Sequence, residues 1–379
     1  MIKGVSRVEK IGLYIHIPFC VSKCPYCDFH SAALGTPLQA QAALDAYADG
    51  LVRSLRVWSE RLNTSADTLY FGGGTPSLMG GERLARVTAE AQRCFGLADA
   101  EVTLEANPAD DLADTLAAFA AAGGNRLSLG MQSAIPAELA LLGRRHTPAD
   151  VARTVTDARR AGIENISLDV MLGIGGQTVA TACASVDAAA ALGATHLSAY
   201  LLKIEPNTPY GACPPDLPTE DESVDLYHAA FQRMAHHGYR QYEISNAALP
   251  GRESRHNLKY WRSEPYLGIG PAASSCVGGK RFTYPRDTAA FLAGNEPVED
   301  PCEGAPVGSA EEYALLRLRL SEGLTEVDFA ARFGTPIPAD WVQRATVLPA
   351  ALVTVDGAGI RLTREGFLLS NAIISRIVG

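Results

Sequence analysis

The sequence predicts an α/β protein built on a parallel sheet, with a smaller α+β domain at its C-terminal end. From residue 11 to about residue 202, short β-branched or apolar runs alternate with Ala- and Leu-rich helical stretches, giving six strand and helix units in succession. Roughly the last seventy residues contain helical stretches with only short strands between them. Successive βα units form a parallel sheet with right-handed crossovers, which is either a partial barrel or a doubly wound sheet.

The elements are expected where the apolar periodicity changes. We expect strands at residues 12–17, 68–72, 101–106, 126–130, 165–170 and 196–202. Helices are expected at residues 39–60, 81–95, 110–122, 148–161 and 180–192, with Gly123 and Gly162 as C-caps. After a Pro-rich break we expect a helix at 220–237, a strand at 239–245 and an irregular segment at 250–308.

These patterns suggest three regions along the chain. Residues 1–205 form the βα region, residues 206–300 flank it, and residues 301–379 form a C-terminal helical domain resembling a winged helix. A parallel barrel carries its functional loops at the C-terminal ends of its strands. We therefore expect functional residues directly after the predicted strands.

Composition limits the class of protein. The chain has 379 residues, of which 47% are hydrophobic and 20% charged, as in a globular protein. Neither a signal peptide nor a run of about 18 apolar residues is present, so we expect a cytoplasmic protein. The net charge of −9 argues against broad electrostatic binding to nucleic acid and makes RNA modification a weaker hypothesis.

Three of the eight cysteines, Cys20, Cys24 and Cys27, lie in the stretch "FCVSKCPYCDFHS". In a reducing compartment such a cluster favours metal binding over disulfides. The spacing C-x3-C-x2-C lets one loop place three thiolates around an iron–sulfur cubane and leaves one iron open. Zinc is the competing interpretation, and it would need His16 or His30 as a fourth ligand. The spacing alone leaves this choice open.

This motif, placed after the first strand of a βα barrel, resembles the radical S-adenosylmethionine (SAM) superfamily. The resemblance implies a radical SAM partial (β/α)6 barrel and a [4Fe-4S] cluster held by the three cysteines. It also implies that SAM chelates the open iron through its amino and carboxylate groups. The cysteine that is absent from the motif would then correspond to the position of the cofactor.

Further motifs resemble the branch that contains the oxygen-independent coproporphyrinogen III oxidases and the HemW-like heme chaperones. In "YIHIPFC", Tyr14 matches a tyrosine near the sulfonium, and Tyr26 matches an aromatic residue beside adenine. In "FGGGTPS", the resemblance implies that the methionine end of SAM is held by Gly73, Gly74 and Thr75. Glycine allows a close backbone approach to a ligand, although a tight turn would need it equally.

Polar residues near the ends of later strands match cofactor contacts of the same branch. They are Glu105, Gln132, Arg144 and Asp169. A purely structural role is the alternative for each residue alone, whereas their order along the strands favours a shared site. The chain departs from the branch at "MLGIGGQT", where Leu172, Ile174 and Gly175 replace the usual residues, and at Ser274, where relatives commonly carry histidine.

Two features separate the chain from the oxidases. The oxidases carry a fourth cysteine where this chain has Phe29, and they have an N-terminal extension, whereas only 19 residues precede Cys20 here. The stretch "HNLKYW" matches a heme-binding motif of the chaperones, which implies that His256 ligates heme. Arg252, Arg255, Lys259 and Arg262 are nearby cations for the propionates. A packed aromatic pair beside a solvated basic face is the alternative.

The resemblance therefore implies a heme chaperone that carries a [4Fe-4S] cluster, SAM and heme, and delivers heme to apo-proteins, among them respiratory ones. The alternative is a radical SAM oxidoreductase acting on a porphyrinogen. The resemblance leaves peripheral membrane association and a homodimer open, and we expect no nucleic-acid partner.

Overall fold

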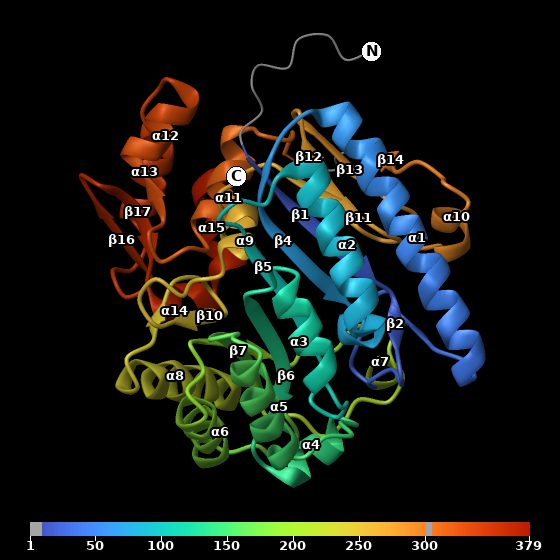
Figure 1. Ribbon diagram of the computed structural model, residues 1–379. Coiled ribbons are helices and arrows are strands. Elements are labelled where there is room, and N and C mark those ends of the chain that lie inside the picture. Colours follow the sequence, from blue (N-terminus) through green and yellow to red (C-terminus); the bar gives the residue numbers. More distant parts are fainter. Residues whose placement is uncertain (1–9, 301–304) are drawn as a thin grey trace.

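The structure is a computed structural model that describes residues 10–300 and 305–379 (Figure 1). A twelve-stranded sheet forms its centre, in the order β14-β13-β12-β11-β1-β4-β5-β6-β7-β8-β10-β9. Within the run from β11 to β8, each strand is parallel to the next. The six that belong to the βα units are β1 (Ile11–Ile17), β4 (Ala66–Gly73), β5 (Glu101–Ala106), β6 (Arg126–Gln132), β7 (Asn165–Leu172) and β8 (His196–Leu201). The predicted α/β fold is confirmed.

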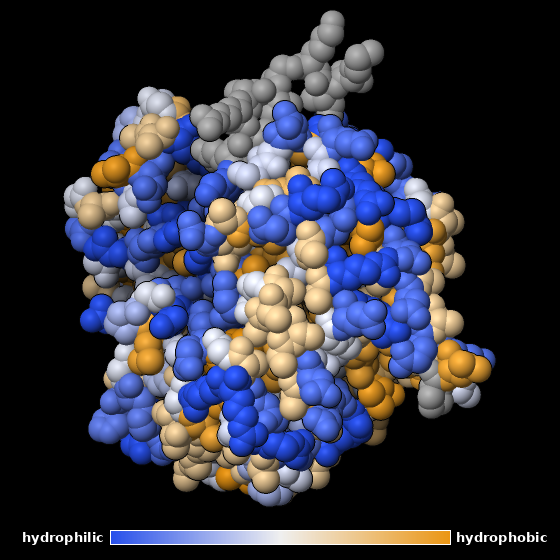
Figure 2. Space-filling model, viewed as in Figure 1, coloured by the Kyte–Doolittle hydropathy of each residue, from blue (hydrophilic) through white to orange (hydrophobic). Residues whose placement is uncertain are grey.

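Helices cover the outer face of this sheet (Figure 1). They are α1 (Pro37–Leu62), α2 (Gly80–Phe95), α3 (Ala113–Ala121), α4 (Pro136–Leu141), α5 (Pro148–Arg160), α6 (Val179–Ala191) and α8 (Glu220–His236). Capping boxes at Thr147, Thr178 and Thr219 start α5, α6 and α8. The exposed side of α1 and α2 is largely hydrophilic, whereas a band of apolar residues is exposed over α3 (Figure 2). Helix α2 buries one apolar face, formed by Leu84, Val87, Ala91 and Phe95.

The inner face of the sheet is polar. Along β6, Leu127 and Leu129 point outward into the core and are fully buried, whereas Arg126 and Ser128 point to the other side. Arg126 and Ser128 line an internal cavity together with Glu105 from β5. A sheet with helices outside and a cavity inside is a partial barrel rather than a doubly wound sheet.

The segment at 250–308 was expected to be irregular, and this expectation is wrong for much of its length. Strand β11 (Tyr266–Ile269) pairs in parallel with β1, and β12 (Ser274–Val277), β13 (Lys280–Thr283) and β14 (Val298–Glu299) extend the sheet in antiparallel fashion. The segment also contains α9 (Arg255–Trp261) and α10 (Thr288–Leu292). These strands have two to four residues each, which is too short for a clear alternation of apolar side chains.

The opposite edge of the sheet also differs from expectation. Of the strand predicted at 239–245, only β9 (Arg240–Gln241) forms. Strand β10 (Asn246–Ala248) pairs antiparallel with both β9 and β8. A short helix, α7 (Pro209–Ala212), lies in the connection before α8. Side chains of residues 226–291 join the core of the βα units, so the flanking segment and the barrel share one core.

The C-terminal residues form a separate core. A three-stranded antiparallel sheet, in the order β15-β17-β16, packs with five helices around Phe329, Trp341 and Ile374. The elements are α11 (Ala310–Arg317), β15 (Leu324–Thr325), α12 (Glu326–Phe333), α13 (Ala339–Thr346), β16 (Val353–Asp356), β17 (Gly359–Leu362), α14 (Arg364–Leu368) and α15 (Ser370–Val378). Within the described ranges, no helix combines the length and the apolar character needed to cross a bilayer.

Candidate cofactor site

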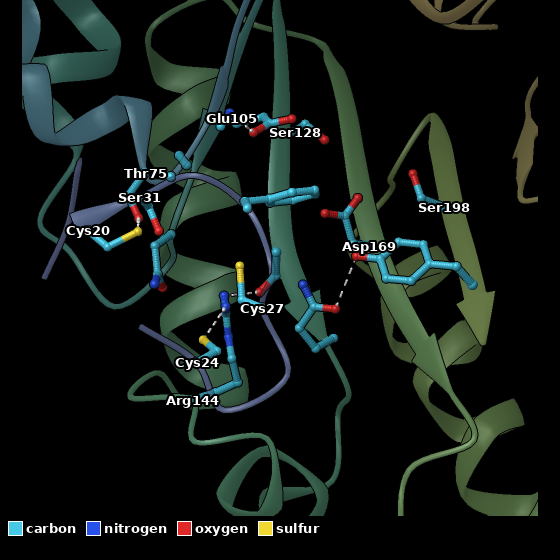
Figure 3. Close-up of a pocket in the computed structure, with 18 of the residues that line it drawn as sticks. Cys20, Cys24, Cys27, Ser31, Thr75, Glu105, Ser128, Arg144, Asp169 and Ser198 are labelled. Carbon is cyan, nitrogen blue, oxygen red and sulfur yellow. Dashed lines mark hydrogen bonds between the residues drawn. The ribbon is translucent and has the colours of Figure 1, made fainter. Parts of the chain in front are cut away.

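One cavity of about 360 Å³ gathers most of the predicted site residues. It lies at the C-terminal ends of the parallel strands, where a barrel carries its functional loops. Figure 3 shows the three cysteine side chains on one side of the cavity and Asp169 with Ser198 on the other. The predicted residues that line it are Cys20, Cys24, Tyr26, Cys27, Gly73, Gly74, Thr75, Glu105, Gln132, Arg144 and Asp169. Tyr14 and His256 do not line it.

The cysteines are held by a closed loop between two very short strands. Strands β2 (Phe19–Cys20) and β3 (Ala32–Ala33) pair with each other, and the amide of Cys27 donates to the carbonyl of Cys24 at 3.2 Å. All three thiols are free, and Cys20 is 9% exposed. The loop therefore presents three sulfur atoms from one backbone turn, the donor set that a three-thiolate iron–sulfur cluster requires.

The glycine-rich loop after β4 is fastened to the cysteine loop. The amide of Gly74 donates to the carbonyl of Ile17 at 2.8 Å, and the amide of Thr75 donates to the carbonyl of Phe19 at 2.7 Å. A Cβ atom on Gly74 would lie 2.5 Å from the carbonyl oxygen of Phe19 and 3.0 Å from the Sγ of Cys20. Glycine at this position is therefore required by packing against the cysteine loop.

His16 is not free to serve as the fourth ligand of a zinc site. Its Nε2 donates to the carbonyl of His30 at 2.9 Å, which leaves Nδ1 as the acceptor from the Tyr14 hydroxyl at 3.1 Å. Burial lowers the pKa of His16 to about 4, so the ring is neutral at pH 7. Among the described residues, no three His, Cys, Asp or Glu side chains gather closely enough to hold a single metal ion.

Two carboxyl groups stand on the inner wall. Glu105 accepts from the Tyr70 hydroxyl at 2.7 Å and from the amide of Gly73 at 3.1 Å. Burial raises the pKa of Glu105. Burial, followed by the nearby Glu105 carboxylate, raises the pKa of Asp169 to about 7, although Ser198 donates a hydrogen bond to it. Carboxyl groups at such depth suit the hydroxyl and ammonium groups of a polar ligand.

Arg144 links the cysteine loop to the barrel wall. Its Nη2 donates to the carbonyl of Gly130 at 2.8 Å, and its Nη1 donates to the Sγ of Cys24 at 3.6 Å (Figure 3). Gln132 has a left-handed backbone, with φ of 66°, and its Oε1 accepts from the Tyr200 hydroxyl at 3.4 Å. Burial raises the pKa of Tyr26, which lies between two of the cysteines. Arg144 and Gln132 are thus held in place by hydrogen bonds before any cofactor binds.

Several lining residues were missed by the sequence reasoning. They are chiefly inward-pointing residues of the strands and of the flanking segment: Tyr70, Arg126, Ser128, His196, Ser198, Tyr200, Asn246 and Asn257. The available signal was a polar residue at every second position of a buried strand, as in Arg126-Leu-Ser128. Arg126 is 2% exposed, and its nearest ionic partner in the described structure is Glu101, at 4.0 Å.

The stretch "HNLKYW" forms α9, which lies against β4 near the N-terminal ends of the barrel strands. His256 is 1% exposed. Its Nδ1 lies 2.7 Å from the Thr68 hydroxyl and its Nε2 lies 2.8 Å from the Tyr260 hydroxyl. Burial, followed by the charge of Lys259, lowers the pKa of His256 to about 3. Heme ligation would require His256 to break a hydrogen bond and leave this site, so its role in heme binding stays a prediction.

The cations around this stretch are also engaged. Lys259 pairs with Asp67 at 2.9 Å and Glu264 at 3.0 Å. Arg262 pairs with Glu322 at 3.2 Å. The side chain of Arg255 donates to the carbonyl of Asp99 at 2.8 Å. This geometry favours the alternative interpretation of "HNLKYW", that of a packing motif.

The two departures from the family pattern have local structural roles. In the loop at 171–176, Ile174 is buried in a small cluster with Leu142 and Met171, and the Gln177 side chain accepts from the amide of Gly173 at 2.8 Å. The hydroxyl of Ser274 lies 2.9 Å from the hydroxyl of Thr283 on the neighbouring strand. Neither Ile174 nor Ser274 lines the cavity.

Comparisons with known proteins agree with this geometry. A family model described as the radical SAM superfamily matches residues 14–189, and one described as the HemN C-terminal domain matches residues 309–369. The heme chaperone HemW of Escherichia coli is 37% identical over 375 residues, covering 97% of this chain and 98% of that protein. HemW of Mycobacterium tuberculosis is 36% identical over 386 residues, covering 98% and 95%.

A solved structure shares the fold at lower identity. The coproporphyrinogen III oxidase HemN of Escherichia coli, described as a radical SAM enzyme, superposes with a TM-score of 0.80 and 22% identity. The match covers 98% of this chain and 91% of that chain. It supports the fold of the whole chain, including the C-terminal region.

Proposed function

The chain belongs to the HemW heme-chaperone family of the radical SAM superfamily, and from this premise we propose that it binds heme and delivers it to heme-accepting apo-proteins. The observation that carries the proposal is the full-length similarity to heme chaperones at 36–37% identity. Respiratory proteins as acceptors and a cytoplasmic location belong to the proposal, which leaves a homodimer and a peripheral contact with membranes open.

The proposal includes a [4Fe-4S] cluster on Cys20, Cys24 and Cys27, with SAM beside it. When bound, the cluster would supply an electron to the sulfonium of SAM. Different residues of the chain would then contact different parts of SAM. The Gly73, Gly74 and Thr75 loop would hold the methionine end, and the buried carboxyl groups of Glu105 and Asp169 would hold its hydroxyl and amino groups.

Purification without oxygen, followed by two parallel assays, tests the proposal. The first measures transfer of heme from the reconstituted protein to an apo-cytochrome. The second measures conversion of coproporphyrinogen III with SAM and a reductant. We expect transfer without conversion. Robust conversion would instead favour the oxidoreductase alternative.

The cluster is tested on the same preparation. Changing Cys20, Cys24 and Cys27 together to Ala should abolish bound iron and sulfide. Cys94→Ala is the matched control, because this free thiol lies on α2 outside the cavity. A triple variant with a full cluster would overturn this part of the proposal.

A further inference from the structure

A histidine can ligate heme iron only through a ring nitrogen that is accessible and not hydrogen-bonded within the protein. The histidines of this chain differ in this accessibility. All eight lie in the described residues. His16, His196 and His256 use both ring nitrogens within the protein. His146 is buried, and His237 pairs with Asp187. Of the remaining His30, His228 and His236, only His30 lies near the cavity, since the other two are on α8.

His30 lies on the cysteine loop, three residues after Cys27. Its backbone carbonyl accepts from His16, and its ring stacks on the His16 ring with a centroid distance of 6.1 Å. Neither ring nitrogen of His30 makes a hydrogen bond to a described residue. Partial burial, followed by the charges of Arg286 and Lys23, lowers the pKa of His30. A partly exposed, neutral imidazole with free nitrogens is suited to bind iron.

The same loop exposes apolar side chains. Phe29, which also lines the cavity mouth, is 65% exposed, and Val21 is 45% exposed. A large aromatic side chain left in water beside a functional cavity is informative, because aromatic residues usually bury their area. A flat porphyrin face would cover such a side chain.

Two cations lie beside the backbone of Asp28 and Phe29. The Nζ of Lys23 donates to the carbonyl of Phe29 at 3.2 Å, and the Nη2 of Arg286 donates to the carbonyl of Asp28 at 2.9 Å. Neither cation forms an ion pair with a carboxylate in the described structure. Asp287 lies nearby, but its Oδ1 accepts from the amide of Ala290 as the N-cap of α10. Lys23 and Arg286 thus keep donors free for anionic groups.

We propose that heme docks on the cysteine loop, with His30 as an axial ligand, Phe29 against the porphyrin, and Lys23 and Arg286 at the propionates. This inference rests on the proposed heme-chaperone function. It replaces the buried His256 with a histidine that needs no rearrangement, and it places heme at the mouth of the cofactor cavity.

A titration of the reconstituted protein with ferric heme, followed by absorption spectroscopy, tests the inference. His30→Gly should lose the spectrum of imidazole-ligated heme and weaken binding more than tenfold. Imidazole added to the His30→Gly variant should restore the spectrum. His236→Gly is the matched control, because this exposed histidine lies on α8, and it should behave as wild type.

A second variant tests the anionic contacts without touching the histidine. Lys23→Gln with Arg286→Gln should weaken heme binding several-fold and preserve the spectrum, because the axial ligand remains. Iron content is measured in each variant, so that loss of the cluster is recognised. If wild type binds heme and both His30→Gly and the double variant bind it equally well, the docking site is refuted while the chaperone proposal stands. If wild type binds no heme, both fail.

Discussion

The Nε2 atom of His256 and the hydroxyl oxygen of Tyr260 lie 2.8 Å apart, one turn apart on the same short helix. The Thr68 hydroxyl occupies the other ring nitrogen. The Tyr14 and Tyr70 rings stack near the imidazole, with centroid distances of 6.3 and 5.1 Å. The imidazole therefore fastens α9 to the strands β1 and β4 of the barrel.

We expect His256→Ala to destabilise the protein by about 3 kcal/mol, because it leaves two buried hydroxyls unpaired and opens a cavity. Denaturant unfolding of the apo-protein measures this loss. His236→Ala, on the exposed side of α8, should change the stability little. If His256→Ala instead kept full stability and lost only the heme spectrum, ligation by His256 would be supported.

The second prediction concerns the pH dependence of stability. The pKa of Asp169 in the folded protein, about 7, lies above the ordinary value of about 3.9. The folded state therefore binds this proton more tightly than the unfolded state. Below about pH 4 the protonated Asp169 contributes its full share to the free energy of unfolding. This contribution falls by up to about 4 kcal/mol as the pH rises towards 7.

Asp169→Asn removes this titration. Near pH 4 the variant and the wild type should have similar unfolding free energies, and at pH 8 the variant should be the more stable one. Asp225→Asn, at an exposed position of α8, is the control. Equal pH slopes in Asp169→Asn and wild type would contradict the raised pKa.

The third prediction concerns Arg126 beneath the two carboxyl groups. Its charge lowers the pKa values of both Glu105 and Asp169 and so opposes the increase that burial causes. In Arg126→Met we expect the pH midpoint for SAM binding to rise by about one unit or more, because the carboxylates lose a buried cation. Arg126→Lys keeps the cation, so its pH midpoint should lie close to that of wild type. Binding measured from pH 6 to 9 checks this, and an unchanged midpoint in Arg126→Met would exclude the electrostatic role.

The sequence was sufficient for the parts of the fold that repeat. The periodicity of the sequence predicts six βα units, and the cysteine loop and the glycine-rich loop, which follow the first two of their strands, line the cavity. The cysteine spacing and the glycine-rich loop are local in sequence, so a motif can identify them. These features gave the correct family and fold.

The remaining features depend on contacts between distant segments. Strand β11 joins β1 although more than two hundred residues separate them, and its four residues carry no clear alternation. Arg126 looks like a surface cation in the sequence, and only the register of β6 turns it inward. The motif suggested heme ligation by His256. The sequence could not show that this side chain is buried and hydrogen-bonded to the distant Thr68.

The last prediction tests whether the glycine-rich loop and the cysteine loop act as one unit. Gly74→Ala would place a Cβ atom 2.5 Å from the carbonyl oxygen of Phe19 and 3.0 Å from both the Sγ of Cys20 and the carbonyl oxygen of Ile17. Two of these three atoms belong to the rigid backbone, so the loop must shift. We expect the amount of iron and sulfide bound after reconstitution to fall at least several-fold.

Gly357→Ala is the matched control, because a Cβ atom there would meet nothing within 4 Å. It should bind iron and sulfide as wild type does. Circular dichroism of both apo-proteins separates a local displacement of the loop from global unfolding, since only the former leaves the helical signal unchanged. A Gly74→Ala protein with a complete cluster would show that the cysteine loop tolerates the shift. The two loops would then hold their ligands independently.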